Sequence, residues 1–123
     1  MGKYVQWITH RERRILLLNA AGLREAEYMV ALEEMKQELI KERAGVLVLV
    51  DATKTEMTTA TINKAKEVAA AIRDKGFLER PSAVGGLTGL QRATAQLFGR
   101  GVHFGATVEE CKEWLVKEDD KRR

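Results

Sequence analysis

The first 43 residues alternate between short apolar runs and one long amphipathic segment. Residues 4–8 alternate in the manner of a strand, and the apolar run at residues 15–18 predicts its hairpin partner. Between residues 23 and 43, apolar side chains recur at gaps of three and four, which predicts an amphipathic helix. The apolar positions of this helix are Ala26, Met29, Val30, Leu32, Met35, Leu39 and Ile40.

The remainder of the chain alternates strands with helices. Residues 46–50 are apolar at every position, which is typical of a strand that is covered on both faces in a parallel sheet. Further strands are predicted at residues 82–85 and 102–104. A helix is predicted to end near residue 74, with a buried side made of Ala65, Val68, Ala69 and Ile72. Two capping boxes, at residues 88–91 and 107–110, predict the starts of two more helices.

The predicted order is β-β-α-β-α-β-α-β-α, which indicates an α/β fold with about four helices. Its sheet is mainly parallel, with the first strand antiparallel at an edge. We expect a single domain over residues 1–118 and a charged C-terminal tail over residues 119–123.

Composition narrows the functional classes. Lys and Arg number 21 and Asp and Glu 18, and this net charge of +3 does not call for a nucleic-acid partner. One cysteine excludes an intrachain disulfide and a thiolate metal cluster, and with two histidines a zinc site would need carboxylates. We therefore expect no metal and no cofactor. No signal peptide or integral membrane segment is evident, and the expected location is cytoplasmic.

Two loops are the candidate ligand or partner surfaces, residues 51–59 and 85–88. Asp51 ends the central strand, where open α/β sheets place ligands, although an Asp there more often caps the following turn, which includes Thr53. Thr58 and Thr59 are candidate phosphoacceptors at a loop-to-helix junction, and the preferred alternative is that one of them caps the helix.

Gly85, Gly86 and Gly89 form a glycine-rich turn before a helix that Thr88 is expected to cap, and this geometry holds phosphates. The segment from residue 80 to 108 contains no acid but includes Arg80, Arg92 and Arg100, which favours an anion, with Arg92 nearest the turn. The alternative is a tight turn with ordinary surface arginines.

No catalytic constellation is recognisable, so we expect a protein that is not an enzyme and assign no catalytic residue. His103 is interpreted as a structural histidine and Cys111 as a buried, inert thiol on an apolar helix stripe. His10 lies in a basic turn and is expected to be solvated.

The element order and several local patterns resemble the STAS-like family of anti-sigma-factor-antagonist domains, and in particular its small, stand-alone bacterial members. The resemblance covers residues 4–118. It is carried by Gly22-Leu23, the strand 46–51 ending in Asp, Ala83-Val84-Gly85, and the segment from Thr107 through Glu110 to Trp114-Leu115. It implies a regulatory or protein-interaction module with an unknown protein partner, and a homodimer stays open.

One departure from the family bears on function. Phosphoregulated members share an Asp-Ser-Ser-Gly or Asp-Ser-Thr-Gly motif where this chain has Glu-Met-Thr-Thr-Ala-Thr at residues 56–61. The absence of this motif therefore weakens the hypothesis of a kinase-controlled switch. Members without the motif are similar to a lipid-transfer fold, which implies the alternative of a carrier of a small apolar or anionic ligand.

Overall fold

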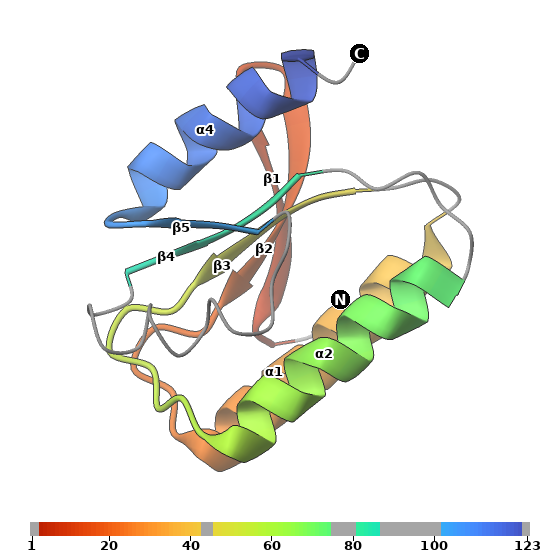
Figure 1. Ribbon diagram of the computed structural model, residues 1–123, viewed down its shortest axis with the longest axis vertical. Helices are drawn as coiled ribbons and strands as arrows, with labels where there is room; N and C mark the ends of the chain where they lie inside the picture. Colours follow the sequence, from red (N-terminus) through yellow and green to blue (C-terminus); the bar gives the residue numbers. More distant parts are fainter. Residues whose placement is uncertain (1–2, 43–45, 75–80, 87–101, 122–123) are drawn as a thin grey trace.

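The computed structural model describes residues 3–42, 46–74, 81–86 and 102–121, and these form a five-stranded mixed sheet with helices on both faces (Figure 1). The strand order is β1-β2-β3-β4-β5, with β1 antiparallel to β2 and the other neighbours parallel. The elements are β1 (Val5–His10), β2 (Arg13–Asn19), α1 (Glu25–Lys41), β3 (Leu47–Asp51), α2 (Thr59–Asp74), β4 (Ser82–Gly85), β5 (Val102–Gly105) and α4 (Val108–Lys121).

The predicted α/β class and the antiparallel edge strand are confirmed. Three of the four expected helices lie within the described segments, and the helix expected from Thr88 lies outside them. No helix of the described segments is long and apolar enough to span a membrane.

The sheet is covered on both faces because its strands alternate apolar side chains between two cores. Leu16, Leu18 and Val50 belong to the core on the α1–α2 face. Ile15, Leu47 and Leu49 belong to the core that includes Leu115 of α4. Figure 1 shows α1 and α2 together on one face of the sheet and α4 on the other. Each fully buried aliphatic side chain contributes roughly 1.5–3 kcal/mol relative to an exposed one, so both layers stabilise the sheet.

The buried stripe of α1 is rotated from the predicted one. Its buried residues are Tyr28, Ala31, Leu32, Met35 and Leu39. Ala26 is exposed and Val30 is 53% exposed, so two of the expected core positions are wrong. The predicted spacing of three and four residues is correct. The stripe includes Tyr28, which was not expected in it, because the large apolar ring of tyrosine packs well in a core.

The predicted stripe of α2 is confirmed in part. Val68 is buried and Ala65 packs against the same core, whereas Ala69 is exposed. The side chain of Ile72 lies outside the described set. Lys64 of α2 donates to Glu33 of α1 at 2.6 Å and to Glu67 at 2.7 Å, which ties the two helices together. The Glu33 and Glu67 hydrogen bonds raise the pKa of Lys64.

The hairpin between β1 and β2 turns more tightly than expected. His10 pairs with Arg13, and the turn consists of Arg11 and Glu12, with φ of 48° and 68°. Positive φ at both central residues is the signature of a type I′ turn, which matches the twist of the strands. The expectation that His10 is solvated is wrong, because its side chain is 23% exposed and its Nε2 lies 2.9 Å from Glu113 Oε1.

The last helix continues further than expected. Residues 119–121, placed in a charged tail by the sequence, belong to α4, which ends at Lys121. Asp119 is 4% exposed, and its Oδ2 lies 3.2 Å from the Nε of Arg13 at the start of β2. Arg13 also forms an ion pair with Asp120. The last turn of the helix is therefore stabilised by a partly buried cationic partner.

Candidate functional site

The carboxyl ends of four strands lie in one row. In the ladder, Asn19 is opposite Asp51, Asp51 is opposite Gly85, and Gly85 is opposite Gly105. The segments that follow these residues therefore leave the sheet side by side. We call this row and the segments after it the carboxyl edge, which is where open α/β sheets place ligands.

Asp51 caps the turn that follows β3, as expected. Its Oδ1 accepts hydrogen bonds from the backbone N–H of Thr53 at 3.1 Å and from Thr53 Oγ1 at 2.7 Å. Such a turn offers the backbone a fixed local partner. Lys54 then has φ of 55°, and the buried Thr55 donates from Oγ1 to the carbonyl of Ala20 at 2.6 Å. The segment is anchored at both ends.

Gly86 belongs to the same cluster because it lies against Thr53. It has φ of +87°, and a Cβ there would overlap Thr53 Oγ1 and lie 3.0 Å from Thr53 Cα. Its N–H donates to the carbonyl of Gly105 at 3.3 Å, so this amide is not available to an anion. Gly85 packs against the start of α4, where a Cβ would lie 3.1 Å from the carbonyl carbon of Thr107. Thr88, Arg92, Arg80 and Arg100 lie outside the described residues.

Thr58 caps α2. Its Oγ1 accepts from the N–H of Thr61 at 3.2 Å, and Thr61 Oγ1 accepts from the N–H of Thr58 at 2.9 Å. This is a reciprocal capping arrangement with threonine in the place of the usual acid. The Thr58 hydroxyl also donates to Glu25 Oε1 at 3.1 Å. Thr59 is exposed at the first helical position.

The starts of α1 and α2 are joined at the same edge. The N–H of Glu25 donates to Glu56 Oε1 at 3.0 Å, and the N–H of Glu56 donates to the carbonyl of Leu23 at 2.9 Å. Together with the Thr58–Glu25 contact, these bonds hold residues 51–59 against the N-terminus of α1. The structure thus brings Asp51, Thr53 and Gly86 into one cluster and places Thr58 and Thr59 in a neighbouring one.

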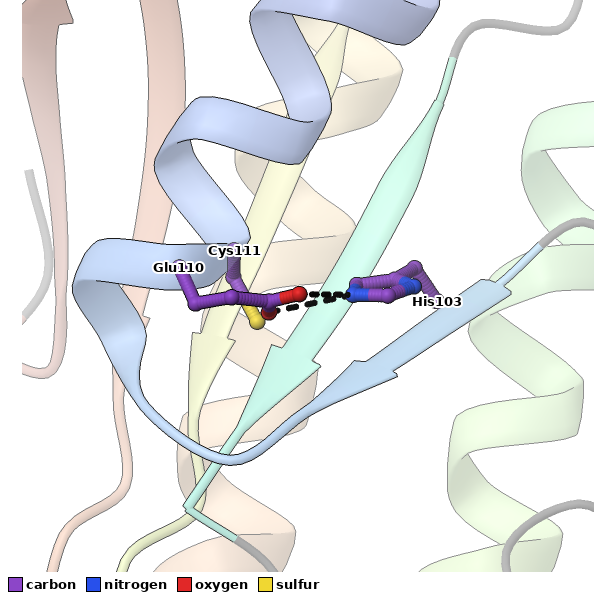
Figure 2. Close-up of side chains that lie close together, drawn as sticks. All are labelled: His103, Glu110 and Cys111. Carbon is purple, nitrogen blue, oxygen red and sulfur yellow. Dashed lines mark hydrogen bonds and ion pairs between the residues drawn. The ribbon is translucent and has the colours of Figure 1, made fainter.

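A third group of side chains lies at the start of α4, and the sequence did not predict it. Thr107 caps the helix by accepting from the N–H of Glu110 at 3.1 Å, as the capping box predicts. The Glu110 carboxylate, however, does not complete the box. Its Oε1 lies 2.9 Å from His103 Nε2, and Figure 2 shows the Cys111 thiol beside the same carboxylate.

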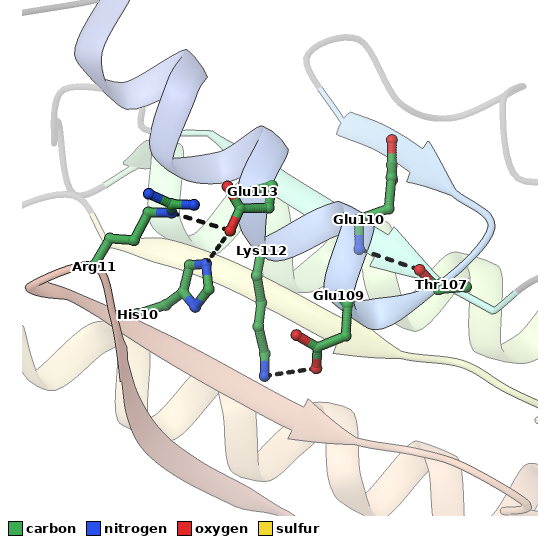
Figure 3. A network of polar contacts seen from close by, with 7 residues as sticks. All are labelled: His10, Arg11, Thr107, Glu109, Glu110, Lys112 and Glu113. Atoms are coloured by element: carbon green, nitrogen blue, oxygen red, sulfur yellow. Dashed lines mark hydrogen bonds and ion pairs between the residues drawn. The ribbon is translucent and has the colours of Figure 1, made fainter.

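The three side chains come together because of the geometry of β5 and α4. His103 points to the α4 face of the sheet, and its ring stacks on Trp114 with centroids 4.5 Å apart and planes inclined by 8°. Cys111 is fully buried, as predicted. Figure 3 shows further polar contacts of α4, including the second histidine–glutamate pair, His10 with Glu113. The Arg11 hydrogen bond, and then that of His10, lowers the pKa of Glu113.

Comparisons with known proteins identify the fold. Neither a scan against protein-family models nor a search of curated proteins finds a match. Among solved structures, an uncharacterized protein of the DUF3478 family with a SpoIIAA-like fold, from Shewanella loihica, superposes with a TM-score of 0.61 at 16% identity. The similarity covers 90% of this chain and 91% of that one. The fold is STAS-like.

A second solved structure agrees. The anti-sigma-factor antagonist (STAS) domain protein of Planctomyces limnophilus matches with a TM-score of 0.59 at 12% identity, over 91% of this chain and 97% of that one. In this STAS-like chain, the carboxyl edge contains the candidate loop of residues 51–59, and the His103, Glu110 and Cys111 cluster lies beside β5 at the start of α4.

Proposed function

We propose that this STAS-like protein is a non-enzymatic interaction module that binds a protein partner through residues 51–59, named here the partner loop. The observation that carries the proposal is that hydrogen bonds and close packing hold the backbone of this loop while it presents exposed side chains. Thr53, Lys54 and Glu56 are exposed, while the backbone around them is held by Asp51, Thr55 and Gly86.

Rigidity supports binding because an ordered loop loses little conformational entropy when a partner docks. The positive φ of Lys54 and the buried hydroxyl of Thr55 hold one loop conformation. The similar Planctomyces limnophilus structure is that of an anti-sigma-factor antagonist domain protein, which supports a regulatory role of this kind. The Oδ1 of Asp51 accepts two hydrogen bonds from Thr53, which supports a structural rather than a catalytic role of that carboxylate.

Site-specific photocrosslinking tests the proposal. A photoreactive amino acid replaces Lys54 in the partner loop, or Lys66 on α2, which is also an exposed lysine and serves as the control. We expect a discrete adduct from position 54 that excess unlabelled protein suppresses, and none from position 66. The captured protein, once purified, should bind the wild-type chain directly, and Lys54→Glu should weaken that binding whereas Lys66→Glu should not.

The outcomes separate the alternatives. Equal adducts from both positions, or a purified partner whose affinity ignores Lys54→Glu, would overturn the assignment of the loop. An adduct with the mass of two copies of this chain would show that the loop contacts a second copy in a homodimer. Native mass spectrometry of the purified protein tests the ligand-carrier alternative, because a retained lipid or anion adds its own mass to the chain.

A further inference from the structure

We propose that His103, Glu110 and Cys111 bind a divalent transition-metal ion of the Zn²⁺ class. One donor atom from each of the three residues lies within 4.8 Å of the other two. They come from different elements, since His103 is on β5 while Glu110 and Cys111 open α4. This inference does not depend on the partner loop or on the proposed function.

The donor set suits zinc. Imidazole nitrogen, carboxylate oxygen and thiolate sulfur bind Zn²⁺ at about 2.0–2.3 Å, and donors around a tetrahedral ion lie roughly 3.5 Å apart. The His103 Nε2 lies 2.9 and 3.1 Å from the two carboxylate oxygens of Glu110, so the pair needs to open only slightly. The complex of a dication with one carboxylate and one thiolate has no net charge, so the positive N-terminus of α4 does not repel it.

The surroundings hold the donors in place. Trp114 fixes the plane of the His103 ring by stacking on it. Gly105 leaves room for the other two donors, because a Cβ there would overlap the Glu110 carboxylate and lie 2.6 Å from Cys111 Sγ. The Glu110 side chain is 50% exposed, which gives an ion access from solvent, while the His103 side chain is 25% exposed.

The arrangement differs from that of a catalytic cysteine–histidine pair. In such a relay, one ring nitrogen faces the thiol and the other is held by the acid. Here the acid is held by Nε2, and Figure 2 shows Glu110 and the Cys111 sulfur on the same side of the ring. Three donors that converge on one point form a chelate. On binding, the Cys111 thiol releases its proton to solvent, and His103 binds as a neutral imidazole through Nε2, so the ring keeps its one proton on Nδ1.

Cobalt and zinc titrations test the proposal on the reduced, metal-free protein. Co²⁺ should add a single equivalent per chain and produce a thiolate-to-cobalt charge-transfer absorption in the near ultraviolet. Cys111→Ala should abolish that absorption. His103→Gln and Glu110→Gln should each weaken Zn²⁺ binding at least about tenfold in competition with a chelating indicator, since loss of a metal-site partner commonly costs 10–100-fold.

The chain offers matched controls. Glu109→Gln alters an exposed neighbouring acid that pairs with Lys112, and His10→Gln alters a histidine–glutamate pair that belongs to a different part of α4. Both should bind Zn²⁺ like the wild type. Circular dichroism identifies any variant that fails to fold, and Trp114 fluorescence in a Trp7→Phe background reports binding in the wild-type site without altering a donor.

Two results would overturn the proposal. One is the absence of charge-transfer absorption at millimolar Co²⁺. The other is Zn²⁺ binding whose affinity is the same in the wild type, His103→Gln and folded Cys111→Ala, because such binding would belong to other surface groups.

Discussion

Tyr28 shows how one side chain can make the stability of the protein depend on pH. The residue is 6% exposed in the core beneath α1, and burial raises the pKa of its phenol to about 12. The neutral phenol is favoured in the folded chain because the core cannot solvate a phenolate. The unfolded chain releases this proton near pH 10.

Tyr28 should therefore destabilise the fold at high pH. Its contribution is complete below pH 10 and is lost as the pH rises from 10 towards 12, because only the folded state still holds the proton there. The loss amounts to about 2–3 kcal/mol. Urea unfolding at several pH values checks this, and Tyr28→Phe should remove that part of the decline. Parallel declines in both proteins would contradict it.

Gly86 and Gly22 form a matched pair for testing the rigidity of the carboxyl edge. Both have positive φ, but a Cβ at Gly22 meets nothing within 4 Å, whereas one at Gly86 would overlap Thr53. Gly22→Ala should cost about 1–2 kcal/mol from backbone strain alone. Gly86→Ala should cost clearly more, and Thr53→Ala should recover part of the excess. Equal costs in denaturant unfolding would show that the loop relaxes freely.

At the scale of elements, the hydroxyl of Thr58 at the start of α2 has two roles, one as an acceptor and one as a donor of a hydrogen bond. Thr58 Oγ1 accepts from the amide of Thr61 and donates to Glu25. An aspartate would serve as a good cap, but its carboxylate would have no proton to offer Glu25. Thr59 is exposed at the first helical position. Among the described contacts, its hydroxyl does not donate to Glu25.

We predict that Thr58→Asp destabilises the protein by about 1 kcal/mol or more, since it replaces a hydrogen bond with repulsion between two carboxylates. Thr59→Asp should be neutral or slightly stabilising, because a negative charge suits a helix N-terminus. Thermal unfolding checks both. Glu25→Gln should restore the stability of Thr58→Asp, and a failure to restore it would mean that Glu25 is not the cause.

Element type was predictable where a local pattern determines it. The uninterrupted apolar run at residues 46–50 indicated a strand covered on both faces, because no solvent-facing position interrupts it, and β3 has a core on each side. The choice of Tyr28 over Val30 was not predictable, since both keep helical spacing and only tertiary packing distinguishes them. Nor was the turn of Glu110 towards His103, because the capping box offered that carboxylate a local partner and Trp114 is needed to place the imidazole.

At the scale of the molecule, the first and last elements are joined by charge. The hairpin residues His10 and Arg11 bind Glu113, and Arg13 binds Asp119, so β1, β2 and α4 form one ion-paired surface. The Asp119 side chain is 6% exposed and that of Asp120 is 55% exposed. The two acids therefore face the same arginine in different surroundings.

Asp119→Asn should destabilise the protein by about 1–3 kcal/mol, because Arg13 loses its charged contact with the buried carboxylate and keeps only the exposed Asp120 as a counter-charge. Asp120→Asn should cost less than about 1 kcal/mol, as exposed ion pairs do. Chemical denaturation of the two variants measures the difference. If both variants lose the same small amount of unfolding free energy, the last turn of α4 is stabilised by helical propensity and not by Arg13.

The position of α4 after the strands that it covers has a consequence for synthesis on the ribosome. Leu115 of α4 packs with Ile15, Leu47 and Leu49, which leave the exit tunnel many residues earlier. Until α4 emerges, those side chains lack this cover, and the N-terminal hairpin lacks Glu113 and Asp119. The nascent chain then presents an apolar sheet face of the kind that chaperones bind, and this face is closed only when α4 has emerged.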